Sequence, residues 1–403
     1  MNTNIEWQGY ARKNGRKGIR NKILVMYTVE CASFVAKEVG IHFRNTNIDV
    51  DVVGFTGCTD NQYALNMLLA LIRHPNVGAV LVIGLGCEYL QADKLAAIAK
   101  EEEKPAQSLL IQNSGGTITS IAEAKEMVTI LHEQLRNKTV RVTMSVDELV
   151  IGAECGGSDY TSGLAGNVVV GSVFDYIVEQ GGTAIFEEIV EAIGLKDMLV
   201  SRGKTKQVGE QLLTTYNKML DYCKSVRQYS VSPGNFAGGL TTIEEKSMGA
   251  FVKSGSKPIA GVLKVAQSAP EQGLWLLDSV PDPTYMSFGY TNPNDSEGLM
   301  DLVCSGAHVL LFVTGRGTVV GSAVSPVIKV TGNRHTYRRM SDDIDFCASD
   351  MLTGEATLAE LTSALFQMII STCQGEQTKA ELLHHKEYYI PYKYQSAGTN
   401  CEG

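Results

Sequence analysis

The stretch Ile151-Gly152-Ala153-Glu154-Cys155-Gly156-Gly157-Ser158-Asp159 decides the fold class of this chain. The apolar residues that end at Ile151 predict the end of a strand, and the glycine pair predicts a turn that is free to take positive φ. Ser158 predicts the N-cap of a following helix. In open α/β sheets, ligands bind outside the carboxyl ends of the strands. A thiol, two carboxylates and a hydroxyl at one such turn therefore favour a functional site, and a half-buried cysteine that packs as a small hydrophobe is the alternative.

Composition limits the class of protein. The 403 residues are too many for one ordinary core and predict two or three domains. Apolar residues make up 44% and charged residues 20%, which is typical of a soluble globular protein. The net charge of −9 argues against a nucleic-acid-binding protein. The chain has no long apolar run and no signal-peptide pattern at its start, so we expect a cytoplasmic protein without a membrane partner.

Strand and helix patterns alternate along the chain. Apolar runs at 23–27, 49–55, 77–83 and 108–112 are each followed by a helical pattern. This alternation predicts an α/β fold of two Rossmann-like units with doubly wound, mainly parallel sheets. We place the first domain at residues 1–144 and the second at 145–403. The polar residues 267–298 predict a long surface loop.

Basic and polar residues near glycines suggest binding sites for an anion. Six cationic side chains lie between residues 9 and 22, where Arg16 or Arg20 could grip a carboxylate, although a solvated basic arm is the alternative. Arg316 follows another predicted strand in a glycine turn. The loop that contains Asn235 fits a small-ligand loop and an ordinary turn equally well.

Three cysteines lie at predicted strand ends, each beside glycine and close to a carboxylate. They are Cys58, Cys87 and Cys155, and the carboxylates include Glu88 and Glu154. Because parallel strands end at one edge of a sheet, the three thiolates could converge on an iron with an open position or on an iron–sulfur cluster. Three buried structural thiols under a glycine-rich rim are the alternative. The chain has no CxxC, HExxH, GxSxG or P-loop motif. The sequence therefore gives no support for a zinc ribbon, a zincin protease, a serine hydrolase or a P-loop NTPase.

At these residues the sequence resembles the altronate and galactarate dehydratase family. The resemblance spans residues 9–394 and is carried by short motifs that follow one another in the family's order. These are Gly15-Arg16-Lys17-Gly18-Ile19-Arg20-Asn21, Gly57-Cys58, Gly84-Leu85-Gly86-Cys87-Glu88, Gly115-Gly116-Thr117, Glu154-Cys155-Gly156-Gly157-Ser158-Asp159, Ser232-Pro233-Gly234-Asn235 and Thr314-Gly315-Arg316-Gly317.

The resemblance implies an iron-dependent hydro-lyase that removes water from a sugar acid, such as D-altronate, to give a 2-keto-3-deoxy acid. The family also includes the large subunit of a sulfolactate sulfo-lyase, and this activity is an alternative hypothesis. A third hypothesis is a non-catalytic sugar-acid-binding module. The implied catalytic residues are Glu88, Glu154, Asp159 and Ser158, the implied iron ligands are Cys58, Cys87 and Cys155, and the implied substrate-binding residues are Arg16, Arg20, Asn21, Gly116, Thr117, Asn235 and Arg316.

The resemblance also implies partners. Single-chain members carry a small extra N-terminal domain, whereas this chain begins close to the first motif. We therefore expect a separate small subunit, as in the two-subunit members, and a homo-oligomer.

Overall fold

The computed structural model describes residues 5–13, 15–226, 231–280 and 294–391. Two parallel sheets form the framework, and a small antiparallel sheet links them. The expectation of an α/β fold with parallel sheets is confirmed. The finer assignment to two Rossmann-like units and the domain boundaries remain predictions. No described helix is long and apolar enough to cross a membrane.

The first sheet has four parallel strands in the order β4-β3-β5-β6. Alternate residues of β3 enter two different cores: Ile23 and Val25 pack with α1 and α4, whereas Leu24 and Met26 pack with α2 and α3. A strand that is covered on both faces needs a continuous apolar run, which is what the sequence shows here. The elements are β3 (Lys22–Tyr27), α1 (Glu30–Phe43), β4 (Val50–Gly54), α2 (Gln62–Arg73), β5 (Val77–Gly84), α3 (Ala92–Glu101), β6 (Ala106–Leu110) and α4 (Thr117–Lys138).

The second sheet has seven parallel strands in the order β10-β11-β9-β8-β12-β13-β14. Its strands are β8 (Val150–Cys155), β9 (Thr183–Phe186), β10 (Ile259–Lys264), β11 (Gly273–Asp278), β12 (Val309–Val313), β13 (Val327–Thr331) and β14 (Phe346–Cys347). Strands β9, β10 and β11 lie on one side of β8, with β11 inserted between β9 and the edge strand β10, whereas β12, β13 and β14 follow one another outward on the other side. Strands β8 and β12 are therefore neighbours where the chain crosses from one side of the sheet to the other. Cys155 pairs with Val313 there. Ligand crevices of open α/β sheets form outside the strand ends at such a point.

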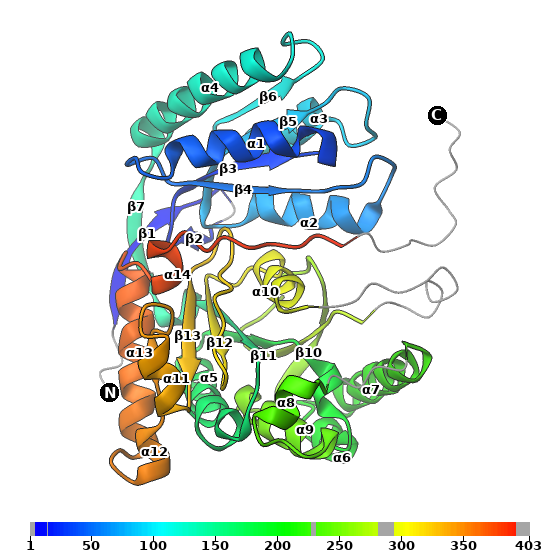
Figure 1. Cartoon of the computed structure of the whole chain (residues 1–403), viewed down its shortest axis with the longest axis vertical. Coiled ribbons are helices and arrows are strands. Elements are labelled where there is room, and N and C mark those ends of the chain that lie inside the picture. Colours follow the sequence, from blue (N-terminus) through cyan, green and yellow to red (C-terminus); the bar gives the residue numbers. More distant parts are fainter. Residues whose placement is uncertain (1–4, 14, 227–230, 281–293, 392–403) are drawn as a thin grey trace.

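Helices cover this second sheet on both faces. The helices of this second unit are α5 (Asn167–Glu179), α6 (Lys196–Ser201), α7 (Lys206–Val226), α8 (Pro233–Ala237), α9 (Ile243–Phe251), α10 (Asp295–Cys304), α11 (Arg334–Arg339), α12 (Asp350–Thr353), α13 (Leu358–Cys373) and α14 (Lys379–Leu382). Helix α10 packs against α2 of the first unit, while α5 packs against α13 on the other face. In Figure 1 the helices α8 and α9 lie at the end of the second sheet that is remote from the first unit.

The predicted loop at 267–298 is wrong in part. Strand β11 lies within this range, and α10 begins there. The apolar run Leu274–Leu277 is short and flanked by polar residues, which hid it in the sequence. Residues 281–293 lie outside the described part of the chain.

The small sheet joins the N-terminal segment to the connection between the two units. It consists of β1 (Glu6–Ala11), β2 (Lys17–Gly18) and β7 (Arg141–Ser145) in the antiparallel order β2-β1-β7. Much of the predicted basic arm is therefore ordered as a hairpin against β7.

Two buried histidines lie where the units meet. The Nδ1 atom of His74 accepts the Asn76 amide proton at 3.1 Å, and its Nε2 lies 3.2 Å from the Ala307 carbonyl. The Nδ1 atom of His308 accepts the Val150 amide proton at 3.0 Å, and its Nε2 lies 2.9 Å from a backbone carbonyl of β2. Both rings are therefore held in the neutral form that is protonated on Nε2.

Protonation of these histidines should destabilise the fold. Burial, followed by the positive charge of Arg16, lowers the pKa of His308 to about 3, and burial also lowers the pKa of His74 well below its usual value. Since the unfolded histidines bind protons near pH 6.5, stability is lost as the pH falls below that value, by about 1.4 kcal/mol per pH unit for each ring.

We predict that the free energy of unfolding, measured in urea at pH 7.5, 6.0 and 5.0, falls less steeply with acid in His308→Gln than in the wild type. The control His42→Gln changes an exposed histidine on α1 and should keep the wild-type slope. Equal slopes in the wild type and His308→Gln would contradict the prediction.

Candidate active site

A cavity of about 850 Å³ opens at the carboxyl edge of the second sheet, outside β8 and β12. The turns that follow these two strands, the first residue of α10, and residues of α8, α9 and α11 form its walls. Its lining includes the predicted residues Cys155, Asp159, Asn235 and Arg316. The structure thus brings together four site residues that are separated by up to 161 positions in the sequence, counted from Cys155 to Arg316.

Asp159 holds the turn after β8 in place. Its Oδ1 accepts hydrogen bonds from the amide and hydroxyl of Thr161 at 2.8 and 2.6 Å and from the amide of Ser162 at 3.1 Å. Its Oδ2 accepts the side-chain amide of Asn333 at 2.9 Å. A carboxylate with four such donors fixes the start of the π-helical turn Ser162–Gly166. Asp159 is therefore placed as an anchor of the loop within the pocket wall.

The thiol of Cys155 lies inside this turn. Its Sγ lies 2.9 Å from the hydroxyl oxygen of Ser158, and the side-chain amide of Asn167 donates to it at 3.7 Å. Burial, followed by the negative charge of Glu191, raises the pKa of the thiol. Asn235 donates from its side-chain amide to the Ser158 carbonyl at 3.0 Å, so α8 closes over the same turn.

Two lysines and two glutamates form a buried charge cluster beside Cys155. Lys246 contacts Glu191 at 2.7 Å, while Lys253 bonds Glu188 and lies 3.3 Å from Glu191. Glu188 also accepts the Cys155 amide at 2.8 Å. Burial lowers the pKa of Lys253, whereas at Lys246 the neighbouring Glu191 outweighs burial and raises the pKa. Lys246 therefore remains an ammonium group at the pocket wall.

Asp295, the first residue of α10, also lines the pocket. Its carboxylate lies against Gly156: a Cβ atom at that position would stand 2.2 Å from Asp295 Oδ2. Burial, followed by the negative charge of Glu191, raises the pKa of Asp295. Within the described ranges this carboxylate makes no ion pair and no hydrogen bond to another residue, and it accepts one only from its own backbone amide. It is therefore available to exchange a proton with a ligand.

Arginine side chains supply positive charge on another part of the wall. Arg316 donates from Nη1 to the Gly234 carbonyl at 2.7 Å, and Arg339 donates to the Arg316 carbonyl at 3.1 Å. His335 lines the same part of the pocket. Each arginine keeps further N–H donors that can bind a carboxylate.

The predicted substrate-binding residues of the basic arm lie elsewhere. Arg20 forms a bidentate pair with Glu381 at 2.8 and 2.9 Å, and Arg16 donates to the Gly306 carbonyl at 3.3 Å. The side chain of Asn21 bonds Arg12 and Thr139. None of the three lines the pocket. Their partners show that these side chains hold parts of the chain together.

Three other predicted residues belong to the edge of the first sheet. Glu88 accepts the amides of Leu85, Gly86 and Cys87 at 2.8–3.1 Å and the Thr28 hydroxyl at 2.5 Å. These donors, chiefly the Thr28 hydroxyl, outweigh burial and lower its pKa. Its carboxylate holds the loop after β5. Gly116 and Thr117 form the start of α4 and do not line the pocket.

Glu154 lies on the opposite face of β8 from Cys155. Its carboxylate is buried beneath α10, where Gly298 leaves room for it, and its Oε2 has no hydrogen-bond partner in the part of the chain that the structure describes. Burial, followed by the charge of Glu187, raises its pKa well above the usual value. Glu154 does not line the pocket.

The three cysteines are not gathered in one place. Cys155 is buried in the pocket wall, whereas Cys58 and Cys87 are exposed on the loops after β4 and β5, where the Tyr89 amide donates to the Cys58 carbonyl. Among the described residues, no group of three or more histidine, cysteine, aspartate or glutamate side chains is arranged to hold a metal ion. The described arrangement therefore does not supply a three-thiolate ligand set within one chain, and iron remains a prediction.

Four residues of the site were not predicted from the sequence, namely Lys246, Lys253, Glu191 and Asp295. The lysines belong to α9 and the segment after it, and Asp295 to α10, at 91, 98 and 140 positions after Cys155. No short motif contains them. Their neighbour Glu188 carried a usable signal, because it follows the apolar run of β9 in the same way as Cys155 follows β8.

Comparison with known proteins agrees with the resemblance. Residues 9–136 match the profile described as D-galactarate dehydratase/altronate hydrolase, second domain, and residues 146–396 match that of the D-galactarate/altronate dehydratase C-terminal domain. Subunit beta of a (2R)-sulfolactate sulfo-lyase from Chromohalobacter salexigens is 32% identical over 96% of this chain and 98% of its own length.

Two dehydratases of Escherichia coli also match. Altronate dehydratase is 32% identical over 96% of this chain and 77% of its own length, and galactarate dehydratase (L-threo-forming) is 33% identical over 75% of this chain and 58% of its own length. The expectation of an enzyme, a carbon–oxygen lyase, is confirmed by these matches. The chain belongs to the D-galactarate/altronate dehydratase family.

Proposed function

We propose that this chain is the catalytic subunit of a hydro-lyase that eliminates water from a sugar acid, such as D-altronate, to give a 2-keto-3-deoxy acid. Family membership supports the reaction class. One observation carries the assignment of the site: the carboxylate of Asp295, which forms no ion pair with any described residue, lines the same pocket as the ammonium group of Lys246 and as Arg316.

The reaction needs a base and an acid. A base must take the proton from the carbon next to the substrate carboxylate, and an acid must protonate the departing hydroxyl. Asp295, whose pKa is raised and whose carboxylate faces the pocket, is our candidate base. Lys246, held by Glu191, is our candidate acid.

The proton removal also builds negative charge on the substrate carboxylate, because the electron pair left on carbon spreads into it. Fixed cations that are already aimed at this charge stabilise the transition state. Arg316 is positioned for this role because Gly157 and Gly234 hold its backbone and guanidinium group in place. The enol that forms after loss of water then becomes the 2-keto acid by taking a proton on carbon.

A second candidate is the elimination of sulfite from (2R)-sulfolactate. The sulfo-lyase relative supports it, and so does the number of cations, since Arg316, Arg339 and Lys246 all line the pocket and sulfolactate carries two anionic groups. The name of that relative, a subunit beta, also supports a proposal that a smaller second subunit works with this chain. We further propose a homo-oligomer.

The substrate proposal is tested on protein purified together with its native partners. D-altronate, galactarate and (2R)-sulfolactate are offered separately, and 2-keto acid and sulfite are measured. We expect 2-keto acid from a sugar acid. Sulfite from sulfolactate, with no turnover of either sugar acid, would replace the first candidate by the second.

Substitution of the proposed base and acid should reduce kcat. We predict that Asp295→Asn and Lys246→Met each lower kcat by about 10²- to 10⁴-fold, which is the usual contribution of a general base or acid. The matched controls Asp197→Asn and Lys196→Met lie on the surface of α6 and should retain full activity. A kcat in Asp295→Asn close to that of its control would refute the role of Asp295.

The pH profile tests the same pair. Asp295 must be ionised to accept a proton, so kcat/KM should fall as the pH falls through its pKa, which burial and Glu191 raise above the ordinary value of 3.8. The positive charge of Lys246 lowers this pKa. We therefore predict that the residual activity of Lys246→Met has its acidic limb at a higher pH than the wild type. An unshifted limb would argue against Asp295 as the group that titrates.

The arrangement of cysteines predicts how iron content responds to substitution. Because Cys58 lies apart from Cys155 in one chain, Cys58→Ser should leave the iron content of anaerobically purified protein unchanged, whatever Cys155→Ser does. The measurement is iron and acid-labile sulfide per chain, together with the absorption spectrum. Loss of iron in both variants would show that these thiols share one centre.

A further inference from the structure

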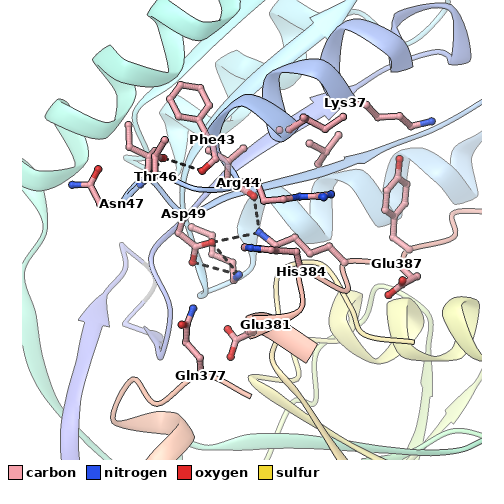
Figure 2. A pocket seen from close by; sticks show the side chains of 18 residues that line it. Lys37, Phe43, Arg44, Thr46, Asn47, Asp49, Gln377, Glu381, His384 and Glu387 are labelled. Carbon is pink, nitrogen blue, oxygen red and sulfur yellow. Dashed lines mark hydrogen bonds and ion pairs between the residues drawn. The ribbon is translucent and has the colours of Figure 1, made fainter. Parts of the chain in front are cut away.

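A second cavity, of about 610 Å³, lies between the first unit and the C-terminal segment (Figure 2). One wall comes from the end of α1 and the loop that precedes β4, and the other from residues 377–388. None of its lining residues lines the candidate active site. Its size is typical of a pocket for a small organic molecule.

The floor of this cavity is a set of matched charges. Lys22 lies 3.1 Å from Asp51 and 3.4 Å from Asp49, and Lys386 lies 2.5 Å from Asp51 and 3.7 Å from Asp49. Asp51 is fully buried, and Lys22 is 4% exposed. Two cations and two anions therefore satisfy one another beneath the cavity.

The rim carries two cations, Lys37 and Arg44, that no such partner balances, and the ring of His384, which is neutral near pH 7 because burial and the nearby cations lower its pKa. Within the described residues, Arg44 makes no side-chain hydrogen bond or ion pair, and the ring of His384 makes no hydrogen bond. Lys37 is exposed, with its Nζ 5.8 Å from the centre of the Tyr27 ring. Figure 2 shows Arg44 and His384 extending from the two different walls. By contrast, the rim carboxylate of Glu381 is already bound by Arg20.

The remaining wall is apolar. It is lined by Ile41, Ile48, Val52 and Tyr388, and the side chain of Ile41 is 53% exposed. An apolar cavity wall beside unmatched cations suits a ligand with an apolar body and an anionic group. His384 also holds a positive φ of 58°, a backbone conformation that non-glycine residues rarely adopt and that is often found at ligand sites.

The cavity wall is connected to a loop that leaves the candidate active site. Residues 318–326 run from the Arg316 turn to β13. Within this loop, Gly321 donates to the Glu387 carboxylate at 2.8 Å and Ala323 to the Glu387 carbonyl at 3.3 Å. The Val324 amide donates to Asp51 at 2.7 Å, and Val324 itself has a positive φ of 73°. The residues that shape the cavity thus also hold this loop.

We propose that this cavity is a binding site for a small organic anion with an apolar body, and that its occupancy stabilises the loop 318–326. The anion bonds Arg44 on one wall and His384 on the other, which fixes the C-terminal segment against the first unit. Since Glu387 belongs to that segment and bonds the loop directly, the loop loses mobility when the cavity is filled. The site is separate from the proposed chemistry and does not depend on the identity of the substrate.

The probe for the test is 1-anilinonaphthalene-8-sulfonate, an anion on an aromatic body, titrated into the full-length protein and followed by fluorescence. We expect one saturable site, with a Kd that rises about tenfold in Arg44→Gln, because one charge-assisted hydrogen bond is lost. The matched control is Arg136→Gln, which removes an exposed arginine from the last turn of α4 and should bind like the wild type.

Hydrogen exchange of the backbone amides gives the second readout. Residues 318–326 should exchange more slowly with the probe bound in the wild type and in Arg136→Gln, but not in Arg44→Gln. An equal Kd in all three proteins would overturn the site. Arg44-dependent binding without protection of residues 318–326 would overturn the connection to the loop. Both readouts are independent of enzyme activity, so a failed substrate proposal would leave them unaffected.

Discussion

The candidate active site depends on the absence of side chains at two adjacent strand ends. After β8, a Cβ atom at Gly156 would stand 2.2 Å from the Asp295 carboxylate, and after β12 a Cβ atom at Gly315 would stand 2.1 Å from the Asp159 carboxylate. Glycine at both positions lets one carboxylate face the pocket and the other fix the loop. The parallel pairing of β8 with β12 brings these two turns together, and the remaining wall residues follow from that pairing.

The buried charges beside Cys155 are consistent with a site that works away from bulk water. Burying Lys253 and Glu191 costs several kcal/mol per ion unless each charge is paired. The pairing here is unequal, because Lys253 and Lys246 share two glutamates while Asp295 is left to face the cavity. Such an arrangement holds groups of different proton affinity close together, which acid–base chemistry requires.

The parts of the candidate site that directly follow a strand of the second sheet could be predicted from the sequence. The apolar runs located β3, β5 and β12, and the glycine turns after β8 and β12 predicted two walls of the pocket. Strand β8 was predicted to end at Ile151 but continues to Cys155, because Gly152, Ala153 and Glu154 extend its pairing with β12. Strand β11 was missed because its apolar run lies within a long polar stretch. Lys246 and Asp295 could not be predicted, because they reach the pocket from helices whose local sequence carries no sign of that contact.

The basic arm shows the limit of reasoning from charge alone. A cluster of arginines predicts an anion partner, but it does not tell whether that partner is a ligand or another part of the chain. Arg20 forms an ion pair with Glu381, which lies 361 positions later in the sequence, and Arg16 donates a hydrogen bond to a backbone carbonyl of the second unit. Similarly, Glu88 sits at a strand end as expected, yet its carboxylate is used by the backbone of its own loop.

The central claim is that catalysis occurs at the carboxyl edge of the second sheet. A crystal structure of the protein soaked with the 2-keto-3-deoxy acid product tests it most directly. We predict that the product lies outside β8 and β12, with its carboxylate at Arg316 and its C3 within reach of Lys246. Product bound at the loops of Cys58 and Cys87, with the pocket of Asp295 empty, would contradict the account.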